Sequence, residues 1–485
     1  MRHLSLAFLT SIIIVMLIFT ACQSAPAEKP APEPAQQETP AKEPAPEPEP
    51  EPAKQPEPTP EPEQEPEPAP PPKPADTTPP PVITGLIAAN AYDGKVNLWW
   101  DKSTAGDCSG YKVYVGVAEI TVINAMEPSV TITDINVCNC QVRFLEDGTP
   151  YYFAVIAVDE SGNENTQVTS VSATPTAMPR GTADPDMEAD IYLSDKAWAG
   201  TTLLPDNHNI QSPRVIEVNM LGEIIWEYVL PQNLRQYTNP GFDVELLPND
   251  NVLLVLPGSG VYEVDRSGST VWSYVDAKVS HDADRLPNGN TIMVFGNEDT
   301  INDAQVKEVN PAGEIVWSWR AGDYYDKPPY DEIYNQGWTH TNAVTRLTNG
   351  NTLLSPRNFN MLAEVDPRGE VVATYGEDFL VDQHDPAVLP DGNILVANHD
   401  TPHTIIEFNP DTGEILWQFV IPDRNNWPVR DANRLPNGNT LITGTTKILE
   451  VTREGTIVWQ FTLDATFQGL ESAARGFYKA ERIDP

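Results

Sequence analysis

The segment Gly-Glu-Ile-Val-Trp at residues 313–317 belongs to a unit that occurs six times in this chain. Each copy runs from a Gly to a Trp, or once to an Ala, and the copies begin at residues 222, 268, 313, 369, 413 and 455. Successive copies are 46, 45, 56, 44 and 42 residues apart. Four short strands in about 45 residues are typical of one β-propeller blade, so six copies predict a six-bladed β-propeller over residues 188–485.

A turn of the type Leu286-Pro287-Asn288-Gly289-Asn290 alternates with this unit. It recurs at Leu247, Leu347, Leu389 and Leu435, each time before a β-rich run. Because five turns serve six blades, we expect residues 477–483 to supply the inner strand of the blade that residues 214–229 begin. The repeated Trp residues are predicted to pack between blades rather than to bind a ligand.

The position five residues before each turn Leu differs from blade to blade, which leaves it free to serve function. In chain order it holds Phe242, His281, Asn342, His384, Arg430 and, in the closing blade, Tyr478. The next position is Asp at 243, 282, 385 and 431, a regularity that indicates a scaffold role. His340 lies two residues before Asn342 and therefore shares its strand face.

A second set of residues is expected at the same mouth of the propeller. The second strand of each blade is antiparallel to the first, so its end lies beside the first strand's start. Aligning the blades on the turn places Arg357 at the position of Gly296, His399 and Thr445. One mouth is thus predicted to gather His281, His340, His384, Arg357 and Arg430, with Asn342, Asn398 and His399 nearby, and with His208 and His403 outside the group.

Three His with two Arg favour an anion over a metal at this mouth. Three imidazoles suit zinc, which is the alternative interpretation, but guanidinium groups would repel a cation. Arginine presents a planar fork that matches an oxyanion, and a His among cationic donors can be a nucleophile toward a transferable group. The ring therefore predicts phosphoryl or sulfuryl chemistry without a metal or a cofactor.

Residues 79–178 show a different pattern of short alternating strands at 95–100, 110–115, 151–158 and 168–173, separated by turn signals. Such spacing predicts a β-sandwich of about 100 residues. Val96-Asn97-Leu98-Trp99-Trp100, Gly110-Tyr111-Lys112-Val113-Tyr114 and the run from Leu145 to Phe153 resemble a fibronectin type III module. That resemblance implies that Trp100 is the core Trp and Tyr151 the corner tyrosine, both structural.

Apart from Cys22 near the N-terminus, the chain has three Cys, at 108, 138 and 140, and all three lie in this segment. In an oxidising compartment we expect Cys108 to pair with either Cys138 or Cys140. Metal or redox work by Cys138-Asn139-Cys140 is the weaker alternative, because the chain has no second matching pair.

The N-terminus predicts export and lipid attachment. Arg2 and His3 precede a short apolar run that ends in Thr20-Ala21-Cys22, which is typical of a lipoprotein signal peptide over residues 1–21 with Cys22 as the lipid-modified residue. A membrane anchor is the alternative, although about 14 apolar residues are fewer than the ~20 a spanning helix needs. The protein is therefore expected outside the cytoplasm, anchored by lipid to the cell envelope on its periplasmic or surface side.

Residues 22–78 are predicted to be a disordered, extended tether. Residues 23–80 hold 22 of the 48 Pro, with 13 acidic and 4 basic residues. Pro removes backbone donors and the charges repel one another, so such a segment cannot build a core.

The chain is strongly acidic, with 30 Lys+Arg against 70 Asp+Glu and a formal net charge of −40. Nucleic acid is therefore excluded as a partner, because phosphate binding needs a basic face. A mouth that gathers Arg and His against this overall sign favours a small anionic substrate.

The propeller segment resembles the arylsulfate sulfotransferases, which are six-bladed and independent of PAPS. The resemblance rests on Ser280-His281-Asp282, Trp338-Thr339-His340-Thr341-Asn342 followed by Ser355-Pro356-Arg357, and Gln383-His384-Asp385. It implies that His384 takes the sulfuryl group from a phenolic sulfate as a sulfohistidine and passes it to a phenol. It also implies that His281, His340 and Arg357 bind sulfuryl oxygens and act as acid or base. Asn342 would assist, and Arg430, Asn398, Tyr478 and Phe242 would line the substrate site.

Two other functions compete with this interpretation. A non-catalytic surface receptor would bind an anionic or glycan ligand at the propeller mouth, with the fibronectin-like module as a spacer or as a glycan contact. A quinoprotein dehydrogenase is the weaker alternative, since such propellers usually have eight blades with different Trp repeats.

Overall fold

The computed structural model describes residues 76–239, 241–422, 428–467 and 475–484. These residues form strands and three short 3₁₀ helices, η1 Ala321–Asp323, η2 Arg357–Phe359 and η3 Ala465–Phe467. The predicted all-β class is therefore confirmed. The signal peptide, Cys22 and the tether up to residue 75 lie outside the described residues, and no helix among the described ones is long and apolar enough to cross a membrane.

The N-terminal part of the described chain contains two small antiparallel sheets, ordered β1-β2-β5 and β4-β3-β6-β7. Their strands are β1 Ile87–Asn90, β2 Val96–Trp99, β3 Cys108–Gly116, β4 Val130–Ile132, β5 Asn139–Val142, β6 Tyr151–Asp159 and β7 Val171–Ala173. Trp100 is buried and its ring meets that of Tyr111 edge-on at 5.5 Å. The Tyr151 hydroxyl accepts a hydrogen bond from the Glu146 amide at 3.1 Å, as a structural tyrosine at a chain corner would.

The expected disulfide is not formed in this structure. Cys108, Cys138 and Cys140 are all free thiols. Cys108 Sγ donates to the Gly110 carbonyl at 3.6 Å, and Cys138 Sγ lies 3.8 Å from the Tyr111 hydroxyl. Cys140 pairs with Leu98 in the β1-β2-β5 sheet, whereas Cys108 begins β3 of the other sheet. Each thiol is packed within this core, where burial raises the pKa of Cys140 to about 12.

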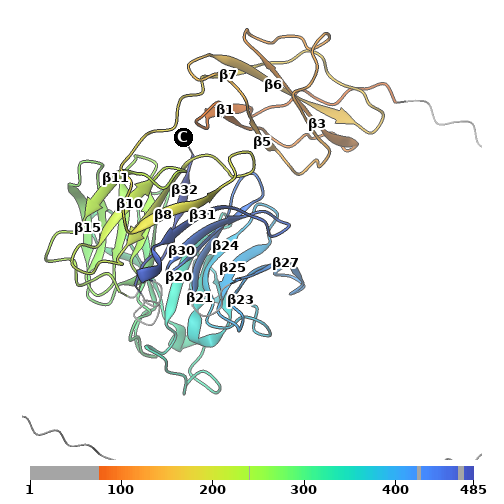
Figure 1. The fold of residues 1–485 in the computed structure, drawn as a ribbon. Coiled ribbons are helices and arrows are strands. Elements are labelled where there is room, and N and C mark those ends of the chain that lie inside the picture. Colours follow the sequence, from red (N-terminus) through yellow and green to blue (C-terminus); the bar gives the residue numbers. More distant parts are fainter. Residues whose placement is uncertain (1–75, 240, 423–427, 468–474, 485) are drawn as a thin grey trace, which may run out of the picture. The chain divides into compact units, whose positions relative to one another are not determined.

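The remainder of the described chain forms six small antiparallel sheets (Figure 1). We number them by their strand order: first β11-β10-β9-β32, second β12–β15, third β16–β19, fourth β20–β23, fifth β24–β27 and sixth β28-β29-β30-β31-β8.

The strands of the first three sheets are β9 Thr201–Asp206, β10 Arg214–Val218, β11 Ile224–Val229, β32 Glu481–Ile483; β12 Asp243–Leu246, β13 Val252–Leu256, β14 Gly260–Val264, β15 Thr270–Val275; β16 Ser280–Arg285, β17 Thr291–Val294, β18 Val306–Val309, β19 Ile315–Trp319. Those of the last three are β20 Thr341–Arg346, β21 Thr352–Pro356, β22 Leu362–Val365, β23 Val371–Tyr375; β24 His384–Val388, β25 Ile394–Asn398, β26 Thr404–Phe408, β27 Ile415–Val420; β28 Val429–Arg434, β29 Thr440–Gly444, β30 Lys447–Val451, β31 Ile457–Leu463 and β8 Met187–Tyr192.

Tryptophan side chains connect neighbouring sheets. Trp226, Trp272 and Trp319 each donate an indole N–H to a backbone carbonyl of the following sheet, at 3.0, 3.0 and 3.2 Å. Trp417 bonds the Arg453 carbonyl of the sixth sheet at 2.7 Å, and Trp459 returns from the sixth sheet to Met220 of the first at 2.9 Å. The predicted packing role is confirmed for the repeated Trp226, Trp272, Trp417 and Trp459. Trp319 lies two residues after the repeated Trp317, which itself packs against Arg346 of the fourth sheet at 5.2 Å. The fourth sheet has Ala373 at the repeated position and meets the fifth through contacts between β20 and β24, so that the sheets form a β-propeller-like cycle.

The C-terminal strand completes the first sheet. β32 pairs with β9 in the register Glu481↔Leu203, Arg482↔Thr202 and Ile483↔Thr201. The expectation that the chain end supplies an inner strand to the sheet begun by residues 214–229 is therefore confirmed. β8, which no repeat predicted, pairs with β31 and covers the free edge of the sixth sheet.

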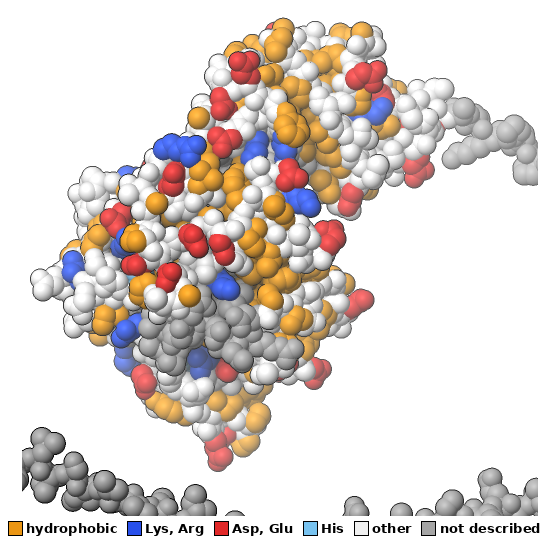
Figure 2. Space-filling view, viewed as in Figure 1, with side chains coloured by type: hydrophobic (Ala, Val, Ile, Leu, Met, Phe, Trp, Pro, Cys, Tyr) orange, Lys and Arg blue, Asp and Glu red, His pale blue; other side chains and the backbone are white. Residues whose placement is uncertain are grey.

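The strand at one end of each sheet contacts its counterparts in the neighbouring sheets, and we call these six the inner strands: β32, β12, β16, β20, β24 and β28. Apolar side chains pack between the sheets, and charged side chains of both signs are interspersed with apolar ones on the face seen in Figure 2. The residues of the predicted ring lie at or just before the starts of the inner strands.

Candidate functional site

The inner strands of four sheets are irregular at the predicted ring position. The register shifts between Ser280 and Ala283, between Thr341 and Val344, between His384 and Ala387, and between Val429 and Asp431. The second sheet, whose ring residue is Phe242, keeps a regular ladder from Asp243 onward. A β-bulge bends its strand and redirects side chains, so the His, Asn and Arg positions each lie where the strand can aim a side chain off the sheet.

Backbone strain is concentrated at the same place. His281, His340, Asp382 and Asp385 have positive φ values of 56°, 47°, 44° and 43°. A non-glycine residue in this region of the backbone torsions costs about 1–3 kcal/mol and keeps the conformation only where surrounding contacts enforce it. Such strain is characteristic of positions where side-chain direction matters more than stability.

His384 is held in one protonation state by two neighbours. Its Nδ1 lies 2.8 Å from the Asp382 carbonyl oxygen, which can only accept, so Nδ1 carries the proton. Its Nε2 lies 3.1 Å from Nη1 of Arg430, which can only donate. Burial lowers the pKa of His384 well below its ordinary value, and His399, Arg430 and Arg357 lower it further. The imidazole is therefore neutral, with a lone pair on Nε2.

His281 and His340 form a second pair of imidazoles, with ring centroids 4.7 Å apart. His340 Nδ1 bonds the Gln336 carbonyl at 2.9 Å, which leaves Nε2 unprotonated. Burial and then Arg357 lower the pKa of His340 to about 4. Burial, His340 and the two arginines Arg357 and Arg430 likewise lower the pKa of His281.

Arg357 comes from η2, directly after β21. Its guanidinium donates to Asn358 Oδ1 at 3.1 and 3.3 Å and lies 3.5 Å from Asp382 Oδ1. Asp382 is an acidic neighbour that the sequence pattern did not indicate. Arg430 lies 5.9 Å from the ring centre of Tyr478, which in turn lies 6.3 Å from His281.

Asn342 reaches the backbone that carries His384. Its Nδ2 donates to the Gln383 carbonyl at 2.9 Å, while its Oδ1 is buried without a partner among the described residues. Gln383 Nε2 bonds the Met361 carbonyl at 2.7 Å and Ser355 Oγ at 3.3 Å. Gln383 thus anchors the start of β24, and Asn342 positions His384 through it.

The remaining predicted substrate-lining residues have different surroundings. Asn398 is fully engaged by the preceding loop, since Oδ1 accepts from Val381 N at 2.7 Å and Nδ2 donates to the Phe379 carbonyl at 3.3 Å. Phe242 is 1% exposed and belongs to the apolar core between the first two sheets. Tyr478 is half-buried beside Arg430 and His281.

His399 lies beside His384 as expected, and His403 extends the cluster beyond the expected set. The His399 ring stacks on that of His384 at 4.3 Å, and its Nε2 bonds the Val429 carbonyl. His403, which was expected outside the group, lies 5.0 Å from His399. The loop from Asn398 to Thr404 curls back between two strands, a path that strand alignment does not reveal.

A layer of carboxylates follows the ring position along the inner strands. Lys479 lies two residues before β32, at the position that is Asp in four other sheets. Its Nζ lies 3.2 Å from Asp282 and Asp385 and 3.7 Å from Asp243. Burial raises the pKa of Asp243 and of Asp431, whose Oδ2 accepts the Ala480 amide. Three of the four expected scaffold Asp residues are thus joined by a single lysine, and the fourth, Asp431, bonds Ala480, the next residue of the chain.

The site combines neutral imidazoles with two guanidinium groups, a set of donors and nucleophiles that suits a tetrahedral oxyanion. Among described residues, three potential metal-ligand atoms lie within 4.8 Å of one another at Asp76, Asp107 and Asp159, a group with no His in it. The imidazoles of the site are spread more widely than one shared ion needs.

Residues 176–378 match the family model "Arylsulfotransferase (ASST)". This stretch contains His281, His340, Asn342 and Arg357 and ends shortly before His384. No curated protein matches the chain.

Three solved structures are distantly similar to this chain. A protein of unknown function from Bacteroides caccae is 18% identical, with 59% of this chain and 100% of that chain covered and a TM-score of 0.45. A virginiamycin B lyase from Staphylococcus aureus is 14% identical over 56% of this chain and 86% of its own, with a TM-score of 0.37. BamB from Moraxella catarrhalis is 12% identical over 81% and 96%, with a TM-score of 0.29.

Proposed function

We propose that the six sheets are the blades of a six-bladed β-propeller whose mouth transfers a sulfuryl group from an aryl sulfate to a phenol, without PAPS. The family match over residues 176–378 supports an arylsulfotransferase at the level of the family. The observation that carries the proposal is the state of His384, whose Nε2 is unprotonated, buried and beside Arg430.

In the first half-reaction, His384 Nε2 attacks the sulfur of the donor. The N–S bond forms as the S–O bond to the aryl group breaks, and the electron pair leaves on the phenolate oxygen. Arg430 exchanges its contact with Nε2 for a sulfuryl oxygen, and Arg357 binds a second one, so that negative charge meets fixed guanidinium groups. The enzyme is left as a sulfohistidine.

In the second half-reaction, the acceptor's phenolic oxygen attacks the same sulfur and the N–S bond breaks, which restores His384. The acceptor proton passes to the Nε2 of His340, which is unprotonated because Nδ1 is committed to the Gln336 carbonyl. Because the pKa of His340 is about 4, the protonated imidazole, with His281 beside it, then releases this proton to solvent, and the donor's aryl group leaves as phenolate. Protons and electrons therefore balance over one cycle.

The test uses 4-nitrophenyl sulfate as donor and phenol as acceptor. We expect wild-type protein to release nitrophenolate and form phenyl sulfate, and His384→Asn to abolish both. His208→Asn is the matched control, because His208 is buried but pairs with Asp206 and Asp186. Sulfate-ester binding without turnover across a donor panel would favour the non-catalytic receptor instead, and a metal assay on purified protein tests the zinc alternative.

We further propose that residues 79–178 are a fibronectin type III module and that Cys22 carries the lipid that tethers the protein to the envelope. Two sheets of three and four strands around buried Trp100 support the module. Mass spectrometry of the mature N-terminus tests the anchor: an acylated Cys22 is expected, and an intact leader or an unmodified Cys22 would contradict it.

A further inference from the structure

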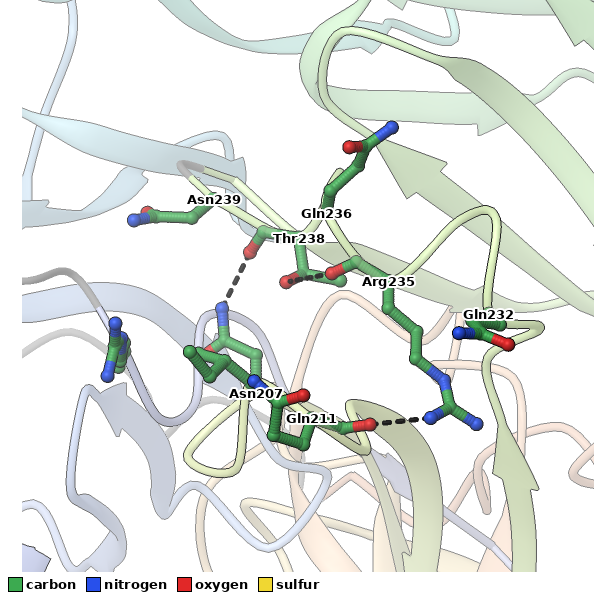
Figure 3. Close-up of a pocket in the computed structure, with 9 residues that line it drawn as sticks. Asn207, Gln211, Gln232, Arg235, Gln236, Thr238 and Asn239 are labelled. Atoms are coloured by element: carbon green, nitrogen blue, oxygen red, sulfur yellow. Dashed lines mark hydrogen bonds between the residues drawn. The ribbon is translucent and has the colours of Figure 1, made fainter.

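A cavity of about 490 Å³ is lined by the residues drawn in Figure 3. Its walls come from the loop between β9 and β10, from the loop between β11 and β12, and from Arg475, which precedes β32. The lining side chains that matter here are Asn207, Gln211, Gln232, Arg235, Gln236 and Thr238. No aromatic residue lines it, and Ile210 is the apolar member.

This cavity shares its walls with the lead-in segments of two inner strands. Thr238 comes four residues before Phe242, and Gly241 between them touches His281. A Cβ added at Gly241 would lie 2.6 Å from the His281 Cα. On the other side, Asn207 Oδ1 accepts the Gly476 amide at 2.6 Å, two residues before Tyr478. The cavity therefore opens at the same mouth as the histidines.

Hydrogen bonds to backbone carbonyls hold two of the lining side chains, Asn207 and Arg235, in place. Asn207 Nδ2 donates to the Thr238 carbonyl at 2.6 Å, and Arg235 donates to the Leu230 and Gln211 carbonyls at 2.9 and 2.6 Å. Figure 3 shows the hydrogen bond between Asn207 and Thr238 and the one between Arg235 and Gln211.

In contrast, the side-chain amides of Gln211, Gln232 and Gln236 have no hydrogen-bond partner within the described chain, and all three residues are exposed. An amide offers a donor and an acceptor together, which matches a hydroxyl group. A plain phenyl ring would gain little from walls of this kind, since aromatic ligands prefer apolar and aromatic linings.

We propose that this cavity holds the polyhydroxylated, sugar-like part of an acceptor whose phenolic hydroxyl reaches His384. The proposal rests on the sulfotransferase function and names its acceptor class: a phenol that carries a glycosyl group. Arg235, fixed by two carbonyls, and the free glutamine amides are the recognition elements.

The first experiment compares phenol with 4-hydroxyphenyl β-glucoside as acceptors of the sulfuryl group from 4-nitrophenyl sulfate. We expect wild type to prefer the glucoside in kcat/KM. The double variant Gln232→Leu, Gln236→Leu should lose about tenfold on the glucoside, because its hydrogen bonds to the sugar hydroxyls are lost, and should keep its rate with phenol. Gln167→Leu, which changes an exposed glutamine between β6 and β7, is the control.

A second experiment separates this inference from the proposed function. Calorimetry with 4-hydroxyphenyl β-glucoside on His384→Asn protein measures binding without turnover, and we expect binding that the added Gln232→Leu, Gln236→Leu changes weaken about tenfold. If donor turnover fails but this binding is observed, the transferase proposal is lost and the sugar pocket stands. Equal kcat/KM for both acceptors, or equal calorimetric binding with and without the two glutamines, overturns the pocket.

Discussion

The reactivity proposed for His384 depends on which of its nitrogens carries the proton. A backbone carbonyl holds the proton on Nδ1, and a guanidinium faces Nε2. Protonation of Nε2 would place a third positive charge beside Arg430 and Arg357, so burial and these charges keep the pKa low. Neutrality at physiological pH is therefore built into the surroundings of this residue.

The pH dependence of the reaction follows from this environment. Acid removes the Nε2 lone pair, so kcat/KM should fall as pH falls through the pKa of His384, and the acid limb should lie well below pH 6.5. Arg430→Gln removes a charge that lowers this pKa, so the limb should move upward toward 6.5. The lost donor should also reduce kcat/KM by about 10²–10³.

The control for Arg430 is Arg320→Gln, which changes an exposed arginine paired with Asp323. It should leave both the rate and the acid limb unchanged. An identical acid limb in wild type and Arg430→Gln would show that Arg430 does not set the pKa of the nucleophile.

At the scale of elements, bulged inner strands and close backbone contacts place the side chains. Gly296 follows β17 and bonds Ser280 Oγ through its amide at 2.9 Å. A Cβ added there would overlap the carbonyl oxygen of Thr341, which lies between His340 and Asn342. The two histidines of the third and fourth sheets can approach each other only because this position has no side chain.

Gly296→Ala should therefore disturb both stability and catalysis. Overpacking typically costs about 1–3 kcal/mol, and displacement of the Thr341 backbone moves His340 with it. We expect a lower urea midpoint and a reduced kcat, measured on the same preparation. Gly106→Ala is the control, since no atom lies within 4 Å of a Cβ added at Gly106. A Gly296→Ala protein with wild-type kcat would argue against tight placement of His340.

At the scale of the whole molecule, one lysine near the C-terminus joins three sheets. Lys479 lies close to Asp243, Asp282 and Asp385, which come from the second, third and fifth sheets. Since β32 closes the first sheet, Lys479 is brought to these carboxylates only when the chain end is in place. The pairing of β32 with β9 and the ion pairs of Lys479 with these three carboxylates therefore form together.

Lys479→Met should destabilise the protein by ~3–5 kcal/mol near pH 7, because it leaves buried carboxylates without their counter-charge. Lys479 lowers the pKa of Asp243 and Asp385, so its removal raises them. The folded variant then binds protons that the unfolded chain does not, and its stability should fall as pH rises from 5 to 7.5.

Urea unfolding at the two pH values measures this difference. Lys278→Met, at an exposed lysine paired with Asp303, is the control and should show little effect. A Lys479→Met penalty that is independent of pH would mean that the carboxylates are not what the lysine stabilises.

Much of the fold could be predicted because the same sequence unit occurs six times, so that each copy supports the interpretation of the others. Six Gly-to-Trp units and five turns indicated the six sheets, the inter-sheet role of the tryptophans and the strand contributed by residues 477–483. The free state of the three Cys could not be predicted, because spacing in sequence does not set the distances between their sulfur atoms in the folded chain. Strand β8 was missed because it lies before the first repeat.

For the site, the sequence by itself determined which residue types occupy the ring, since a strand register places equivalent positions at one level. Only the tertiary structure decided how they meet. It supplies the bulges that turn His281 and His384, the carbonyls that set the tautomers of His340 and His384, the return of His403 and the confinement of Phe242 to the core. These depend on backbone torsions and on contacts between sheets far apart in sequence. A repeat specifies the strand position of a residue, but packing decides the direction and the contacts of its side chain.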